Sequence, residues 1–174
     1  VPVRNGSNRV PYKNTRPFAD LSLLQLKLKL LKNIVGITKI VVSTDCPISA
    51  DIACKNGVEV QWRNKYYAGS KITNDLHWFH IAETTPGDIV FLAQVTSPLL
   101  KVSSMQTALN SFLSSDKHDS INSVSAEKKF LWKNKKPINY DINKTPKSQD
   151  LPNIVSLNFA ITIIQKQTMM KRKM

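Results

Sequence analysis

Short apolar runs alternate with amphipathic helical segments along the first two thirds of the chain, and this alternation constrains the fold more than any other feature. Buried strands are expected at residues 1–3, 39–45, 58–62 and 89–93. Helices are expected at residues 18–34, 47–56, 71–84 and 102–114. Strands that alternate with helices favour a parallel sheet with right-handed crossovers. The sequence therefore predicts a single-domain α/β fold with a mainly parallel, doubly wound, Rossmann-like sheet.

The helix expected at residues 18–34 has a clear apolar face. Its leucines recur at spacings of three and four, at Leu21, Leu24, Leu28 and Leu31. Such spacing is typical of a helix that packs on a sheet. We expect the lysines of this segment, Lys27, Lys29 and Lys32, to lie off that face.

The pattern changes after residue 115. Residues 120–125 alternate as a strand, residues 157–164 form a further apolar strand, and a helix is expected from Gln165. Residues 133–153 are rich in Lys, Asn and Pro and are expected to form a long surface loop, which in a small domain is usually functional or mobile.

Charge points to an anionic partner. The 174 residues include 25 Lys and Arg against 12 Asp and Glu, a formal net charge of +13. A nucleotide, a nucleic acid or an acidic surface would fit this charge, and a general compositional bias is the alternative. The cations do not form one stripe interleaved with aromatic residues, which argues against a nucleic-acid-binding module.

Two further features concern the surroundings of the protein. No apolar run approaches the ~18 residues of a membrane span, and no signal peptide is visible, so no membrane partner is expected. Cys46 and Cys54 are eight residues apart with no metal-ligand pattern around them. We expect both to be reduced core residues of a cytoplasmic protein.

A loop with the chemistry of a phosphate site follows the first expected strand. It carries Arg4, Gly6, Ser7, Arg9 and Lys13 and contains no acidic residue. A glycine turn lets backbone N–H groups converge on an anion, Ser7 adds a hydroxyl donor, and Arg4 with Lys13 could hold two phosphoryl groups of one polyphosphate. A solvated basic loop is the alternative. Its place after a strand favours the phosphate site, because open α/β sheets bind ligands at the carboxyl ends of their strands.

Other polar residues follow the later strands. Asp45 ends one strand and is as consistent with a helix cap as with a site, and residues 94–97 end the strand at 89–93. His77 and His80 fall on the helix at 71–84, where we expect surface or hydrogen-bonded core residues. Neither GxGxxG nor GxxxxGK[ST] occurs, so the usual dinucleotide and P-loop motifs are missing.

Several segments together resemble the acylneuraminate cytidylyltransferases, the CMP-sialic acid synthetases. Residues 2–14 (PVRNGSNRVPYKN) resemble the P-A-R-x-G-S-K-R-x-x-x-K-N signature of this family, residues 41–45 resemble V-V-S-T-D, and residues 94–99 resemble Q-P-T-S-P-L. Residues 146–152 and 157–160 resemble the R-R-Q-D-L-P and N-G-A elements. The resemblance covers residues 1–174 and implies one cytidylyltransferase domain with the nucleotide-diphospho-sugar transferase type of fold.

The resemblance implies a reaction in which CTP and a nonulosonic, sialic-acid-like 2-keto sugar acid give the CMP-sugar and pyrophosphate, with Mg²⁺. By position, Arg4 and Lys13 would be catalytic. Residues that would bind the nucleotide are Arg4, Gly6, Ser7, Asn8, Arg9, Lys13, Asn14, Thr96 and Ser97. Residues that would bind the acceptor are Gln94, Gln149 and Asn158. The resemblance also implies a homodimer, with residues 115–160 as an excursion for dimerisation or acceptor binding.

The chain departs from the family at several positions. Asn8 replaces a lysine, Ser70 an aspartate, Val95 a proline and Leu100 an arginine, and Phe159 interrupts N-G-A. The chain starts inside its first strand, and the acidic D-I-D element expected to bind the metal falls beyond Met174, so segments are expected at both ends. The alternatives are activation of the eight-carbon acid Kdo and a degenerate, non-catalytic nucleotide-binding homologue.

Overall fold

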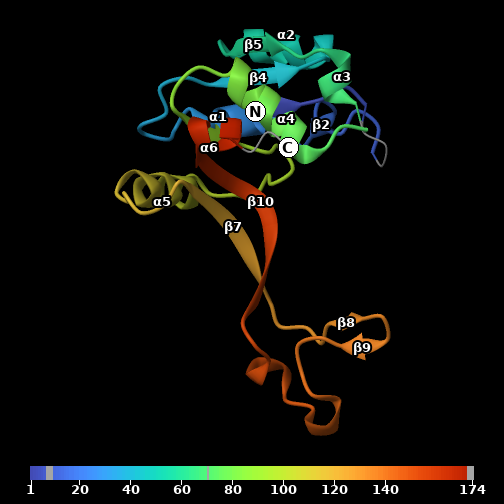
Figure 1. The fold of residues 1–174 in the computed structure, drawn as a ribbon. Helices are drawn as coiled ribbons and strands as arrows, with labels where there is room; N and C mark the ends of the chain where they lie inside the picture. Colours follow the sequence, from blue (N-terminus) through green and yellow to red (C-terminus); the bar gives the residue numbers. More distant parts are fainter. Residues whose placement is uncertain (7–9, 70, 172–174) are drawn as a thin grey trace. The chain divides into compact units, whose positions relative to one another are not determined.

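Strands β1 (Pro2–Val3), β4 (Val41–Thr44) and β5 (Glu59–Trp62) form the parallel sheet that the alternation predicts. The computed structural model describes residues 1–6, 10–69 and 71–171 (Figure 1). The three strands pair in the order β1-β4-β5, and both pairs are parallel. Helices α1 (Leu23–Leu31) and α2 (Pro47–Lys55) connect these strands. The predicted α/β class with a parallel sheet is confirmed.

A second three-stranded sheet has the order β6-β10-β7, with β6 at Ile89–Leu92, β10 at Ile154–Gln165 and β7 at Ser120–Glu127. Strand β10 runs antiparallel to β6, with Thr162 opposite Leu92. The alternation does not predict this pair, because β10 returns to the sheet only after the long polar segment. The remaining helices are α3 (Lys65–Ala68), α4 (Asn74–Thr84), α5 (Val102–Leu113) and α6 (Lys166–Lys171).

Helix α1 starts later than the expected residue 18. The strands β2 (Pro17–Phe18) and β3 (Leu21–Ser22) pair first in a short antiparallel ladder. Ser22 then caps the helix: its Oγ accepts from the Gln25 N–H at 3.2 Å, while the Gln25 side chain accepts from the Ser22 N–H. This reciprocal capping box fixes the helix start.

One expectation about α1 is wrong. Leu24 and Leu28 are fully buried as expected, but Lys27 is buried with them, at 1% exposure. Lys27 lies three residues after Leu24 and four before Leu31, and a helix with 3.6 residues per turn puts all three on one face. Its side chain therefore extends through the interior of the domain.

The chain divides into two compact units: a main unit, Val1–Asn122 with Ala160–Met174, and an excursion unit, Ser123–Phe159. The excursion unit contains β8 (Trp132–Lys133), β9 (Lys136–Pro137) and two 3-10 turns, η1 (Ile142–Lys144) and η2 (Ser148–Asp150). The long surface loop expected at 133–153 contains these short elements. Asn134 and Lys135 both have positive φ, as a two-residue hairpin turn requires.

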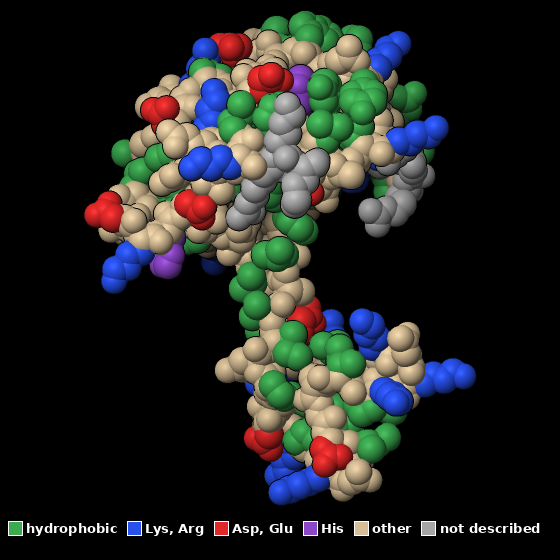
Figure 2. All heavy atoms as spheres, viewed as in Figure 1, with side chains coloured by type: hydrophobic (Ala, Val, Ile, Leu, Met, Phe, Trp, Pro, Cys, Tyr) green, Lys and Arg blue, Asp and Glu red, His purple; other side chains and the backbone are tan. Residues whose placement is uncertain are grey.

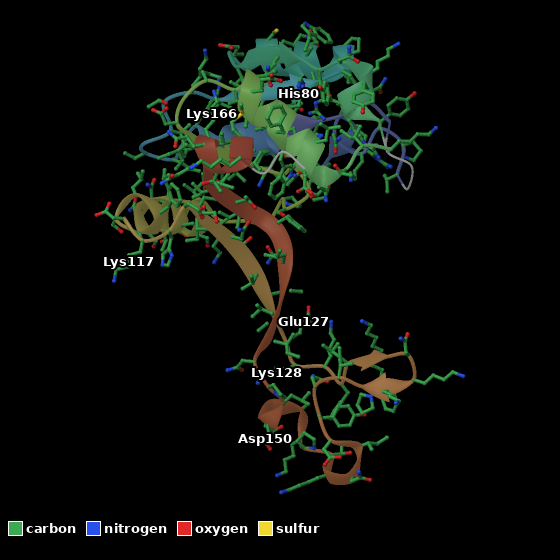
Figure 3. All side chains as sticks on the ribbon, viewed as in Figure 1. His80, Lys117, Glu127, Lys128, Asp150 and Lys166 are labelled. Carbon is green, nitrogen blue, oxygen red and sulfur yellow. The ribbon has the colours of Figure 1, made fainter. Side chains whose placement is uncertain are left out.

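A lysine holds the base of the excursion unit together. Lys128 Nζ donates to the carbonyl oxygen of Leu151 at 2.6 Å and to Asn153 Oδ1 at 3.0 Å, near Asp150 in Figure 3. These bonds join the segment by which the chain enters the excursion unit to the segment by which it leaves. They do so without a large apolar core.

The two cysteines differ in their exposure. Cys46 is buried as expected, but Cys54 is exposed on α2, because it faces away from the sheet. No described helix is long and apolar enough to cross a membrane.

Candidate active site

A polar cavity of about 340 Å³ lies where the strands of the main unit end. It is lined by Pro2, Arg4, Gly6, Lys13, Asn14, Arg63, His77, Gln94, Val95 and Thr96. None of these described lining residues carries a carboxylate, whereas three carry a permanent positive charge. We call it the cationic cavity. Its composition suits an anion with several negative groups.

A second cavity, of about 360 Å³, lies among the opposite ends of the strands and is lined mostly by apolar side chains such as Ile40, Phe91 and Leu109. It gathers no set of converging charged groups among the described residues. The cationic cavity is therefore the better candidate for chemistry, although the apolar one is slightly larger.

The loop after β1 is held from outside the cationic cavity. The backbone N–H of Asn5 donates to Asp45 Oδ1 at 2.6 Å, and Gly6 follows with a φ of +74°, a conformation that favours glycine. Asp45 stands directly after β4, and the N-cap of α2 is the next residue, Cys46. Asp45 therefore anchors the loop and leaves the arginine and lysine of the cavity without a carboxylate partner inside it.

Arg63 is a residue of the cavity that sequence reasoning missed. It is 5% exposed and stands directly after β5. Its Nε donates to Ser43 Oγ at 3.2 Å and its Nη2 donates to the Ser43 carbonyl oxygen. Burial lowers the pKa of Arg63, and the neighbouring Asp45 opposes that shift. Arg63 lies at the carboxyl end of a strand, as the loop after β1 does. This position is the signal in the sequence that could have identified Arg63.

His77, on α4, also lines the cavity, contrary to the expectation of a surface or core residue. Its Nδ1 lies 3.3 Å from the carbonyl oxygen of Tyr67. Burial, with a contribution from the Arg63 charge, lowers the pKa of His77 to about 4. His77 is therefore neutral near pH 7. His80, one turn later (labelled in Figure 3), is buried and stacks on the Tyr67 ring at a centroid distance of 3.9 Å.

The buried Lys27 supports the loop after β6. Its Nζ donates to the carbonyl oxygen of Ser97 at 3.1 Å, and burial lowers its pKa. Lys27 forms no ion pair with a carboxylate of the described residues. Residues 94–96 of the same loop line the cavity. Lys27 thus fixes one wall of the cavity from the interior.

The structure brings together many of the residues singled out from the sequence. Those that line the cavity are Arg4, Gly6, Lys13, Asn14, Gln94 and Thr96. Ser97 lies next to them and binds Lys27. Ser7, Asn8, Arg9 and Ser70 lie outside the described residues. The roles assigned to all of these residues stay predictions.

Gln149 and Asn158 belong to the excursion unit. Asn158 binds across that unit: its Nδ2 donates to Ser125 Oγ at 3.0 Å, and Ser123 Oγ donates to its Oδ1. This position ties β10 to β7. Whether either residue contacts an acceptor stays a prediction.

Comparison with known proteins identifies the family. A sequence model described as cytidylyltransferase matches residues 1–158. The chain belongs to the cytidylyltransferase family. The CMP-N,N'-diacetyllegionaminic acid synthase of Legionella pneumophila is 30% identical over 115 residues, which cover 63% of this chain and 50% of the synthase. The match therefore spans half the length of that curated relative.

Solved structures share the fold of this cytidylyltransferase. A CMP:2-keto-3-deoxy-manno-octonic acid synthetase complexed with CTP has a TM-score of 0.74 at 14% identity, covering 97% of this chain and 73% of the synthetase. A 4-diphosphocytidyl-2C-methyl-D-erythritol synthase from Anaerococcus prevotii has a TM-score of 0.66 at 14% identity. The match covers 98% of this chain and 70% of the synthase. At these identities the likeness establishes the fold alone.

The buried lysine leads to a first prediction. Lys27→Met should leave the melting temperature unchanged or raise it, because an apolar side chain of similar shape avoids burying a charge. The loop after β6 loses its anchor, so affinity for a nucleoside triphosphate should fall about 2- to 10-fold, the value of one modest hydrogen bond. Thermal melts with and without CTP measure both quantities. Lys29→Met, on the exposed side of the same helix, is the matched control, and a large loss of stability in Lys27→Met would contradict the prediction.

Proposed function

We propose that the chain binds CTP in the cationic cavity and transfers CMP to a nonulosonic, sialic-acid-like 2-keto sugar acid, releasing pyrophosphate. The observation that carries the proposal is the convergence of Arg4, Lys13 and Arg63 on one cavity that no described carboxylate lines. A triphosphate supplies the matching negative charge. Family membership supports the choice of a cytidine nucleotide.

The chemistry needs little beyond positioning and charge. A hydroxyl oxygen of the acceptor attacks the α-phosphorus in line and one P–O bond forms. The bond from the α-phosphorus to the oxygen that bridges to the β-phosphate breaks, and the hydroxyl proton is released to solvent. Negative charge accumulates on the leaving pyrophosphate as that bond breaks. Arg4 offers a planar fork and Lys13 a point charge to the leaving group, and positive charges held where negative charge develops stabilise the transition state more than the ground state.

The loop formed by residues 94–97 is proposed to bind the acceptor through Gln94 and part of the nucleotide through Thr96 and Ser97. Gln94 lines the cavity with a neutral donor and acceptor, as recognition of a polyhydroxylated acid requires. The named product of the Legionella relative is a CMP-linked legionaminic acid derivative. That name favours a nine-carbon sugar acid over the eight-carbon acid Kdo.

Magnesium is part of the proposal because a bound triphosphate supplies oxygen ligands of its own. Among the described residues, no group of three or more His, Cys, Asp and Glu side chains could hold a metal ion. No step is therefore assigned to protein-bound metal. A cytoplasmic setting is also proposed, in keeping with the free thiols Cys46 and Cys54.

A homodimer formed through the excursion unit completes the proposal. Figure 2 shows apolar side chains on the surface of this unit among lysines. Its exposed apolar residues include Phe130, Trp132, Ile138, Ile142, Val155 and Leu157. Exposed apolar area of this kind is typical of protein interfaces. Light scattering tests the dimer.

Pyrophosphate release is the experiment that tests the activity. The protein is incubated with CTP and magnesium, in separate reactions, with N-acetylneuraminic, legionaminic and pseudaminic acids and Kdo. We expect release with a nine-carbon acid and none after addition of EDTA. Release only with Kdo would favour the eight-carbon alternative. CTP binding without release from any acceptor would contradict the proposed activity and favour a non-catalytic nucleotide-binding role.

A further inference from the structure

The hydrogen-bonding state of His77 is fixed by its neighbour. The carbonyl oxygen of Tyr67 can only accept a hydrogen bond, so the His77 Nδ1 that lies 3.3 Å away must carry the proton. The imidazole is neutral near pH 7, as its lowered pKa indicates. A neutral ring protonated on Nδ1 has a bare Nε2. His77, which lines the cationic cavity, therefore carries a hydrogen-bond acceptor on Nε2.

This acceptor does not suit a phosphate. The oxygens of a triphosphate also accept hydrogen bonds, and a bond from His77 to them would require protonation of Nε2. Burial and the nearby charges of Arg63 and Arg4 oppose that protonation. The other ionisable side chains that line the cavity, Arg4, Lys13 and Arg63, are donors. His77 is thus matched to a different part of the ligand, one that carries an N–H or O–H group.

The cationic cavity extends from the loop after β1 to Arg63, which follows β5, and β4 lies between these two strands. Arg4 reaches across from the loop, since its Nη1 donates to the carbonyl oxygen of Ala68 at 3.5 Å, and the charges of Arg63 and Arg4 both act on His77. Two steps of strand spacing amount to roughly 10 Å. A nucleotide whose phosphates lie at the loop can span such a distance with its ribose and base. Gln94, the residue proposed to bind the acceptor, lies in the loop after β6, which belongs to the other sheet.

We propose that His77 is a specificity-determining residue that reads the base: its Nε2 accepts a hydrogen bond from the exocyclic amino group of cytosine. Uracil carries a carbonyl oxygen at the same position, so two acceptors would face each other and neither would be satisfied. Ribose hydroxyls can donate or accept and would not give this discrimination. The inference rests on the proposed function in taking CTP as the ligand.

The test compares CTP with UTP, both as substrates and as ligands. In the unsubstituted chain, CTP should be preferred in kcat/KM and in Kd. His77→Phe keeps a flat ring without an acceptor and should reduce the preference about 10- to 100-fold, the value of one hydrogen bond in a desolvated site. His77→Asn, which keeps a hydrogen-bond acceptor, should retain more of the preference for CTP over UTP than His77→Phe does. His118→Asn, at an exposed histidine, should leave it unchanged.

Each other outcome has a definite meaning. Equal binding of CTP and UTP by the unsubstituted chain, or a preference that survives in His77→Phe, would overturn the inference. If His77→Phe altered the preference for CTP over dCTP and left the preference for CTP over UTP unchanged, His77 would contact the ribose. That result would also overturn the inference. Preferential CTP binding that His77 controls, without pyrophosphate release, would support the inference while contradicting the proposed activity. Thermal melts with each variant exclude unfolding as the cause.

Discussion

Lys13→Ala is expected to lower kcat for pyrophosphate release roughly 100- to 1,000-fold, the usual cost of removing one preorganised charge that stabilises a transition state. Lys13 lines the cationic cavity on the loop after β1, where no described lining residue offers a carboxylate partner. Its charge is therefore available to a ligand. Because negative charge grows on pyrophosphate as the bond breaks, the loss should fall mainly on kcat and less on the KM for CTP.

Single-turnover and steady-state rates with CTP and the preferred acceptor measure this loss. Lys117→Ala is the control, since this lysine is exposed on the main unit after α5 (Figure 3). Lys13→Arg should recover part of the rate, because it restores charge with a different geometry. If the KM for CTP rose while kcat stayed constant, Lys13 would bind ground state and transition state equally.

Arg63→Met is expected to weaken CTP binding about 10- to 100-fold, the value of one or two charge-assisted hydrogen bonds. Arg63 is nearly fully buried, lines the cavity and is braced on Ser43, so its guanidinium is already oriented before a ligand arrives. The substitution also removes a positive charge from the side of the cavity next to β5.

Calorimetric titration with CTP measures this effect, and thermal unfolding separates it from a loss of structure. Stability should change little, because the apolar methionine avoids the burial of a charge while it gives up the bonds to Ser43. Lys65→Met, at an exposed cation two residues later, is the matched control. Unchanged CTP affinity in a folded Arg63→Met protein would remove Arg63 from the binding site.

Most helices and strands could be predicted because their patterns are local. The buried run of β4 and the leucine face of α1 follow from spacing that any helix or strand must obey. Helix α1 starts later than its pattern predicts, since the ladder between β2 and β3 competes with the helix for residues 17–22. Lys27 is buried although it is charged, because its position on the helix places it on the apolar face.

The candidate site was predictable where its residues are close in sequence. Residues 2–14 hold their glycine, arginine and lysine within one loop, so their joint chemistry can be recognised without a structure. Arg63 and His77 reach the same cavity from β5 and α4, about 60 residues further along the chain. No spacing rule joins residues so far apart.

The sequence alone determined the α/β class, the parallel core of the sheet and the basic loop after its first strand, because periodicity and residue type act over a few neighbouring residues. Tertiary structure decided which side chains surround that loop. The order β1-β4-β5 brings Arg63 toward the phosphate loop, Tyr67 fixes the proton of His77, and the buried Lys27 holds Ser97 from beneath. Each of these contacts joins segments that meet only when the sheet and its helices pack, so each depends on the whole fold.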